Sequence, residues 1–198
     1  MKRLFLLCVA AWIAPGLAAA APIASGAYDN TLLVAVDPAT GVLSGYFDMT
    51  EVRQVSFSCI FYIKGKQGGG AVDTFDIADR KGDLIRGALT PTGRGKLQLV
   101  LPEDHGGCAN LQSFTDKTAP VDFELQTARP WTAVRVVKAD KAYFYPTPDA
   151  AAHGRAYIVK DDGVGQLATK PGWVQAEFTG GAHVIAGWLR AADLYSTP

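Results

Sequence analysis

The loop 102–110 carries the side chains of this sequence that are best suited to chemistry. Asp104 and His105 are adjacent, and Cys108 follows the histidine by three residues. A carboxylate, an imidazole and a thiolate can bind a metal ion, but such a site needs three or four ligands, and no second His/Cys pair lies nearby in the sequence. We therefore expect no metal and no cofactor. Asp104 and His105 remain candidate binding residues on a loop whose glycines permit sharp bends.

Cys108 can instead pair with Cys59. If residues 1–20 are an export signal, these two cysteines of the mature chain most simply form a disulfide. This bridge would close a loop of about 50 residues and stabilise the fold by about 4 kcal/mol on the chain-entropy model. The alternative is a reactive thiol with His105 as its base, which requires a reducing compartment. Export favours the disulfide.

Residues 1–20 have the pattern of an export signal. A short basic start precedes the apolar run Leu4–Ile13, and small residues continue to Ala20. The run is shorter than the ~20 apolar residues that cross a bilayer, so a retained anchor is the less favoured alternative. We expect cleavage after Ala20 and a periplasmic or secreted protein with no stable membrane span.

The charge balance argues against two classes of partner. Lys plus Arg total 19 and Asp plus Glu total 19, so the formal net charge is zero, and no basic block stands out. General nucleic-acid binding and polybasic membrane anchoring both need concentrated positive charge. No hydrolase, kinase or dinucleotide signature is present either.

The chain after the signal alternates apolar and polar residues over short runs, which is typical of strands. The odd-numbered residues from Val55 to Ile63, among them Phe57 and Cys59, share an apolar face, so the bridge should point inward.

Other runs continue the same pattern. Asp37–Gly41 is a turn by composition and should join strands 28–36 and 42–47 in a hairpin. Further strand candidates lie at 72–77, 84–89, 96–101 and 121–125. We expect an all-β fold with an antiparallel barrel or sandwich at 21–128.

Thr127–Pro130 is the expected linker to a second strand-rich domain at 131–198. Its centre is a hairpin in which 172–178 and 183–189 flank a glycine-rich turn, and each arm carries a Gly-Trp pair. Asp149, Asp161 and Asp162 lack the spacing of a calcium loop, so they are expected to form turns.

Tyr143–Asp149, Ala156–Asp162, Gly172-Trp173-Val174 and Gly187-Trp188-Leu189 together resemble the bacterial SH3-like domain family. The resemblance covers roughly the last third of the chain. It implies a small five-stranded barrel, non-catalytic, that often targets cell-wall peptide or glycan. The first half is similar only in general layout to exported lysozyme inhibitors and other small envelope binding proteins.

Aromatic residues of this C-terminal half are the candidate binding residues. Trp173 is expected in the core because its strand lies at the middle of the pattern. Tyr143, Tyr145 and Tyr157 are the expected surface residues, and Trp188 is a further candidate, because exposed rings stack on sugars or hold peptides.

Three functions follow from these patterns. The first is a non-enzymatic envelope protein that binds cell-wall peptide or glycan, or a wall-acting protein. The second is an inhibitor or immunity protein that blocks a wall-degrading enzyme with loop 102–110. The third, ranked last, is a hydrolase that uses Asp104 and His105.

Overall fold

The protein is built from antiparallel strands, which confirms the expected all-β class. The computed structural model describes residues 22–68, 70–76, 84–152 and 154–196, so the expected export signal at 1–20 lies outside the described residues. No helix in these ranges is long and apolar enough to cross a membrane. The elements are β1 (Gly26–Tyr28), β2 (Leu32–Val36), β3 (Val42–Val52), β4 (Ser56–Lys66), β5 (Ala71–Phe75), β6 (Ile85–Gly93), β7 (Lys96–Val100), η1 (Cys108–Asn110), β8 (Val121–Ala128), β9 (Ala133–Val136), β10 (Lys141–Tyr143), β11 (Tyr157–Val159), β12 (Gly163–Lys170), β13 (Trp173–Phe178), β14 (Ile185–Arg190) and η2 (Ala191–Asp193).

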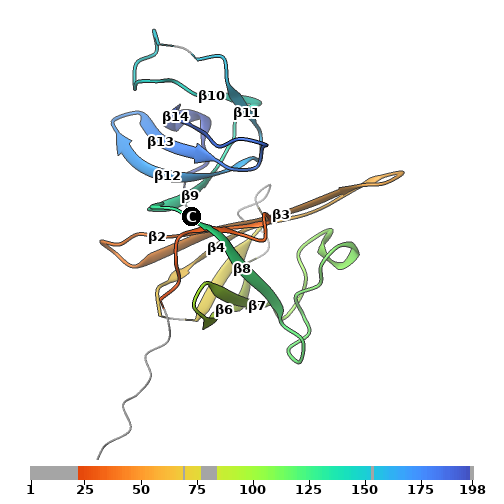
Figure 1. The fold of residues 1–198 in the computed structure, drawn as a ribbon. Coiled ribbons are helices and arrows are strands. Elements are labelled where there is room, and N and C mark those ends of the chain that lie inside the picture. The colour runs from red at the N-terminus through yellow and green to blue at the C-terminus, as the bar shows by residue number, and fades with distance from the viewer. Residues whose placement is uncertain (1–21, 69, 77–83, 153, 197–198) are drawn as a thin grey trace, which may run out of the picture.

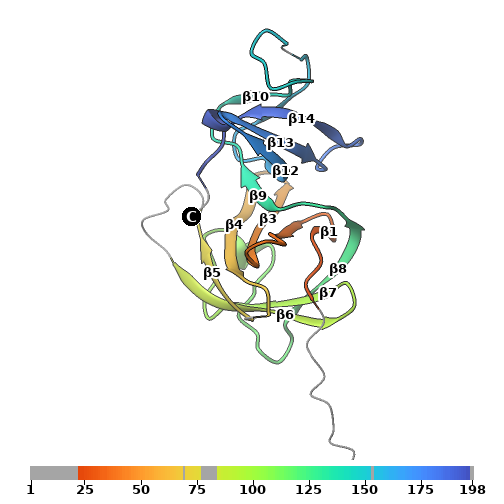
Figure 2. The same cartoon turned by 90° about the vertical axis from the view of Figure 1, so that its left-hand side faces the viewer.

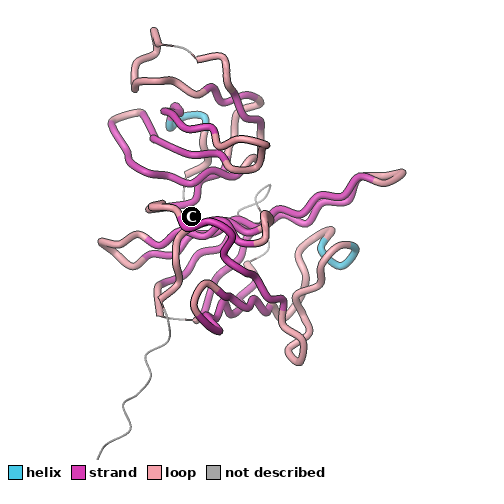
Figure 3. The backbone as a smooth tube through the Cα atoms, viewed as in Figure 1, coloured by secondary structure: helices cyan, strands magenta, loops and turns pink. Residues whose placement is uncertain are grey.

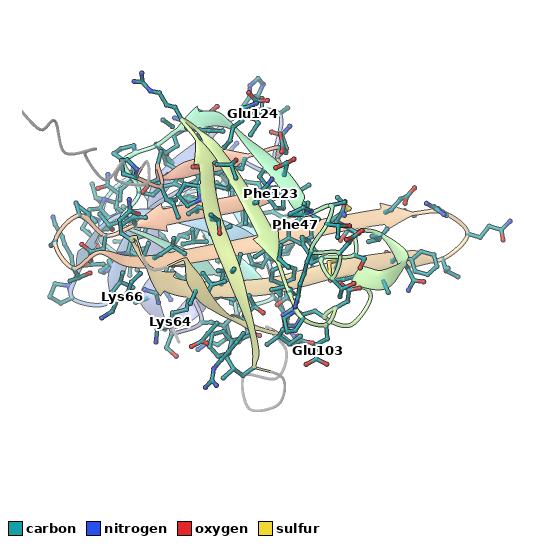
Figure 4. All side chains as sticks on the ribbon, turned by 90° about the horizontal axis from the view of Figure 1, so that it is seen from below. Phe47, Lys64, Lys66, Glu103, Phe123 and Glu124 are labelled. Carbon is teal, nitrogen blue, oxygen red and sulfur yellow. A yellow bond between two sulfur atoms is a disulfide. The ribbon has the colours of Figure 1, made fainter. Side chains whose placement is uncertain are left out.

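Strands β1 to β8 form a closed barrel in which β8 pairs back onto β1 (Figure 2). The N-terminal half is therefore a barrel and not a sandwich. Its interior is aromatic: the Phe47 ring lies 5.1 Å from both Phe61 and Phe114 and 6.0 Å from Phe123. Figure 4 labels Phe47 and Phe123 within this interior. Closure pairs both edges of the sheet, so the core is shielded all round.

The expected single strand at 28–36 is wrong. Asp29 and Asn30 have φ of 46° and 59°, so a tight turn separates β1 from β2. Asp and Asn tolerate this left-handed region better than other non-glycine residues do. The turn at 37–41 and the hairpin to β3 are confirmed, since β2 pairs with β3 from Leu32↔Phe47 onward.

Strands β3 and β4 form an arm that extends beyond the barrel (Figures 1 and 3). Each strand has 11 residues, which corresponds to about 35 Å. Residues 50–56 at its tip are all exposed. The expectation that Val55 and Phe57 point inward is therefore wrong: Val55 is 60% exposed and Phe57 is half-buried. Alternation fixes which residues share a face, but the barrel covers that face only as far as Cys59.

The expected disulfide joins Cys59 to Cys108, and both cysteines are buried. It ties the root of the arm to η1. Gly107 has φ +82°, and a Cβ there would lie 2.0 Å from the carbonyl oxygen of Ser58. Only glycine permits this approach, so the bridge and Gly107 together hold the 105–112 loop against the arm.

Strands β9 to β14 form a four-stranded sheet in the order β14-β13-β12-β9 and a two-stranded sheet, β10-β11 (Figure 1). The Gly-Trp hairpin is confirmed, because β13 pairs with β14 from Trp173↔Arg190 to Phe178↔Ile185. An apolar cluster separate from the barrel interior fills this part. It includes Val137, Ala142, Phe144, Ile158, Val164, Val174, Ala176, Leu189 and Leu194.

The expected linker is displaced along the chain. Thr127 and Ala128 belong to β8, where they pair with Ala27 and Gly26 of β1. Barrel closure requires these residues, so the connection to β9 runs from Arg129 to Thr132.

Trp131 is the centre of the contact between the barrel and the four-stranded sheet. Its side chain is 1% exposed and belongs to a cluster with Tyr46, Tyr62 and Val134, drawn from both sides. The Tyr62 hydroxyl donates to the Val134 carbonyl at 3.0 Å, and the Val134 amide donates to the Ser44 hydroxyl at 2.8 Å. This interface is thus both apolar and hydrogen-bonded across its width.

Gly165 makes room for the indole ring of Trp131. A Cβ at this position would lie 2.0 Å from the ring. We expect Gly165→Ala to lower the free energy of unfolding by about 1–3 kcal/mol, because the ring must shift within a packed interface. Urea unfolding measures this. Gly93→Ala in β6 is the matched control, since a Cβ there meets no atom within 4 Å; equal losses in both variants would contradict the prediction.

Candidate functional site

Asp104 and His105 have structural partners. A carboxylate oxygen of Asp104 accepts the Phe114 amide at 2.8 Å. His105 is 4% exposed and stacks on Phe61 at 4.8 Å. The Thr74 hydroxyl donates its proton to the Ile85 carbonyl, so it accepts from Nε2 of His105 at 2.7 Å. These contacts fix the loop over the end of the barrel.

A small polar cavity of 270 Å³ lies beside this loop, lined by Asp76, Glu103, Asp104 and His105 among others. Figure 4 labels Glu103, which belongs to this loop. No group of three or more His, Cys, Asp or Glu side chains within the described ranges could hold a metal ion.

Tyr143 and Tyr157 come together at the β10–β11 pair. Their rings lie 5.6 Å apart, and the ammonium group of Lys141 lies 4.5 Å from the Tyr157 ring. Tyr157 is 45% exposed and Tyr143 is half-buried, so this pair offers surface area to a ligand, as the sequence suggested.

A second aromatic group lies on the outward face of β13 and β14. Trp173 pairs with Arg190, and Lys170 of β12 pairs with Trp173, so the three side chains share one face. Trp188 and Tyr145 are paired by an isolated bridge on the same face. We call these five residues the aromatic–cationic face.

The cations of this face lie over its rings. The Lys170 ammonium is 5.2 Å from the Trp188 ring, and the Arg190 guanidinium is 5.5 Å from the Tyr145 ring. Tyr145 also meets Trp173 edge-on at 5.0 Å. Cation–π contacts of this kind hold long basic side chains in place over an aromatic floor.

Burial of these aromatic residues differs from expectation. Trp173 was expected in the core, but it is half-buried on the outward face, while its neighbour Val174 points into the apolar cluster. Tyr145 was expected at the surface, but only 4% of it is exposed. Trp188 is 9% exposed. A central strand has two faces of equal length, and the sequence alone does not show which one is covered.

A cleft of 340 Å³ opens between the barrel and the four-stranded sheet. Tyr46 and Asp48 line it from β3, and Asp162, Gly163 and Phe178 line it from the other side. The Tyr46 hydroxyl donates to the carbonyl of Asp161 and so spans the two parts. A Cβ on Gly163 would lie 2.4 Å from the Tyr46 ring, so glycine permits this contact.

Three ionisable groups of this cleft have raised pKa values. Burial is the main cause that raises the pKa of Asp48, and the charges of Asp162 and Asp161 raise it further. Burial likewise raises the pKa of Asp162. The pKa of the Tyr46 hydroxyl also rises, chiefly through burial. Carboxylates from two parts of the fold therefore meet in a partly desolvated space.

Sequence reasoning missed the cleft residues and Trp131. Asp48 and Asp162 lie more than 100 residues apart in the sequence; Asp48 belongs to no motif, and Asp162 was expected only as a turn residue at the end of the SH3-like stretch. The Arg129-Pro130-Trp131 run offered one signal, because a tryptophan beside a linker is a common interface residue.

Comparison with known proteins gives no relative: no family model, curated protein or solved structure matches this chain.

The raised pKa of Asp48 predicts how the free energy of unfolding depends on pH. The folded protein binds this proton more tightly than the unfolded chain does, so stability falls as pH rises from about 4 through the folded pKa. Asp48→Asn removes this loss. We expect the variant to gain free energy of unfolding relative to the parent across that window and to keep the gain above it.

Urea unfolding over a pH series checks this. Asp116→Asn is the contrasting control, because hydrogen bonds from Thr118 lower the pKa of Asp116, and ionised Asp116 therefore stabilises the fold. Its effect should have the opposite sign. A parent-minus-D48N difference that is constant from pH 3 to 8 would refute the prediction.

Proposed function

We propose that this protein is an exported, non-enzymatic envelope protein that binds cell-wall material or a wall-acting protein through its C-terminal half. The aromatic–cationic face carries this proposal. The half-buried ring of Trp173 can stack on a sugar, and Lys170 and Arg190, held over the Trp188 and Tyr145 rings, can pair with carboxylates of wall peptides. The resemblance to the SH3-like family and the buried disulfide, which suits an oxidising compartment, both support it.

The aromatic–cationic face is accessible because the barrel covers only one end of the outward surface of the sheet. Trp131 and Val134 lie at that end, beside β9 and β12, where the barrel packs. Lys170 and Arg190, at the opposite end, are exposed. A ligand there would meet two cations first and the ring of Trp173 beside them.

The contacts of loop 102–110 favour a non-enzymatic role. Asp104 accepts a backbone amide, and His105 lies beneath the surface against Phe61. A catalytic pair would need both groups to reach a substrate. His105→Ala is expected to loosen the loop and leave wall binding unchanged.

The double variant Lys170→Ala/Arg190→Ala tests the face. We expect its retention on purified cell wall to fall at least tenfold, about 1.4 kcal/mol, because two charge-assisted contacts are lost. Arg94→Ala/Lys96→Ala is the control, since both cations are exposed on the β6–β7 hairpin of the barrel. Unchanged retention of the first variant, or equal loss in the control, would overturn the proposal.

Inhibition of a wall-degrading enzyme is the second candidate function, and the arm favours it. Val52 and Val55 are 78% and 60% exposed at its tip, on either side of Arg53. The disulfide braces the root of the arm beside loop 102–110. Isolated apolar side chains on a braced hairpin are suited to enter a concave site of a partner, with the ribbon's edges free to pair.

The arm tip gives a separate prediction. We expect Val52→Ser/Val55→Ser to weaken inhibition of a muramidase such as lysozyme at least tenfold, because the tip loses its apolar contacts. Val42→Ser/Val159→Ser is the matched control, as both of these valines are exposed elsewhere. Turbidity loss of a wall suspension measures the enzyme. No inhibition by the parent protein would remove this function and leave the wall-binding proposal standing.

A further inference from the structure

We propose that the cleft between the barrel and the four-stranded sheet binds a neutral, hydroxyl-rich sugar. This site is distinct from the aromatic–cationic face and does not depend on it. Its volume of 340 Å³ falls within the range of small-ligand sites, and such sites favour the boundary between two packed bodies.

Acceptors of the cleft come from both sides. A Thr50 hydroxyl donates to one oxygen of Asp48 at 3.2 Å, and the Val159 amide donates to one oxygen of Asp162 at 2.7 Å. Within the described residues the second oxygen of each carboxylate has no hydrogen bond. A carboxylate is an acceptor only, so these two oxygens call for hydroxyl or amide donors.

A donor of the cleft is Arg129. Its Nε is buried and has no hydrogen-bond partner in the described part of the chain. The nearest anion, Glu177, lies 4.0 Å away and already accepts the indole N–H of Trp131 at 2.9 Å. A guanidinium is a donor only, and the Arg129 side chain is 28% exposed where it lines the cleft, so a ligand that offers an acceptor suits this part of the site.

The two requirements select the ligand class. A cationic ligand would pair with Asp48 and Asp162 but would be repelled by Arg129. An anionic ligand would pair with Arg129 but would be repelled by the two carboxylates. A hydroxyl group donates and accepts, so a neutral sugar satisfies both without an unpaired buried charge. Hydroxyls of Thr31 and Thr179 and the amide of Asn30 add groups of both kinds around the mouth.

Apolar walls complete the site. The Tyr46 and Phe178 rings and the side chain of Leu33 line it. Tyr46 is fixed by its hydrogen bond to the Asp161 carbonyl, and Gly180 packs on Phe178. Tyr46 is 2% exposed, so the half-buried Phe178 ring is the one that offers a flat surface for the C–H face of a pyranose, at little entropic cost.

Four sugars with the same ring but different charge test the inference in the full protein. Glucose and N-acetylglucosamine are neutral, glucosamine is a cation and glucuronate is an anion. We expect the neutral pair to shift the amide NMR signals of Thr31, Gly163 and Thr179, and to bind at least tenfold more tightly than the charged pair. Concentrations up to about 50 mM reach the weak affinities usual for single small ligands.

Variants test the cleft residues, and the positions of the shifted NMR signals distinguish the cleft from the aromatic–cationic face. Thr31→Val and Asp48→Asn should each weaken neutral-sugar binding at least threefold, and retained thermal unfolding would show that both variants fold. Lys96→Ala, an exposed cation on the β6–β7 hairpin and outside both proposed sites, is the control and should bind these sugars as the parent does. The inference is overturned if no neutral sugar shifts the cleft signals, or if a charged sugar binds more tightly. It is overturned too if all shifts map to the aromatic–cationic face, a result that would leave wall binding by that face intact.

Discussion

The packing of Trp131 against Gly165 is the contact on which the rest of the structure depends. A buried indole joins the barrel to the four-stranded sheet, and its N–H is satisfied by Glu177 at 2.9 Å. Because the ring fills the space above a glycine, the sheet lies close to the barrel at β9 and β12. That approach creates the cleft on one side and leaves the far end of the sheet uncovered.

The two candidate ligand surfaces follow from this single docking. The cleft combines carboxylates of Asp48 and Asp162 with the guanidinium of Arg129, so it favours a ligand without net charge. The aromatic–cationic face presents Lys170 and Arg190, so it favours carboxylates. A wall glycan with peptide side chains carries both chemistries, so under the two proposals one protein molecule would bind it at two places.

The disulfide acts at a different point of the fold. It braces the arm at Cys59 and holds the 105–112 loop beneath it. Asp104 and His105, which looked reactive in the sequence, complete this brace through Phe114 and Thr74. Residue types suited to catalysis are equally suited to satisfying buried backbone and hydroxyl groups, and the local sequence does not distinguish the two uses.

Alternation and turn composition predicted most strands, the hairpins at 37–41 and 172–189, and the Cys59–Cys108 bridge. These features depend on neighbours in the chain: side-chain period, glycine at a turn, and the number of cysteines. The break after Tyr28 was missed because two polar residues can either continue a strand or turn it.

The sequence by itself determined the all-β class, the presence of the terminal hairpin and the identity of the disulfide. Only the tertiary structure decided that Trp131 is buried between the barrel and the four-stranded sheet, that Trp173 faces outward and that Asp48 meets Asp162. A period of two assigns residues to one of two faces but does not say which face another sheet will cover. That choice depends on contacts between residues far apart in the chain, and these exist only once both parts have folded and docked.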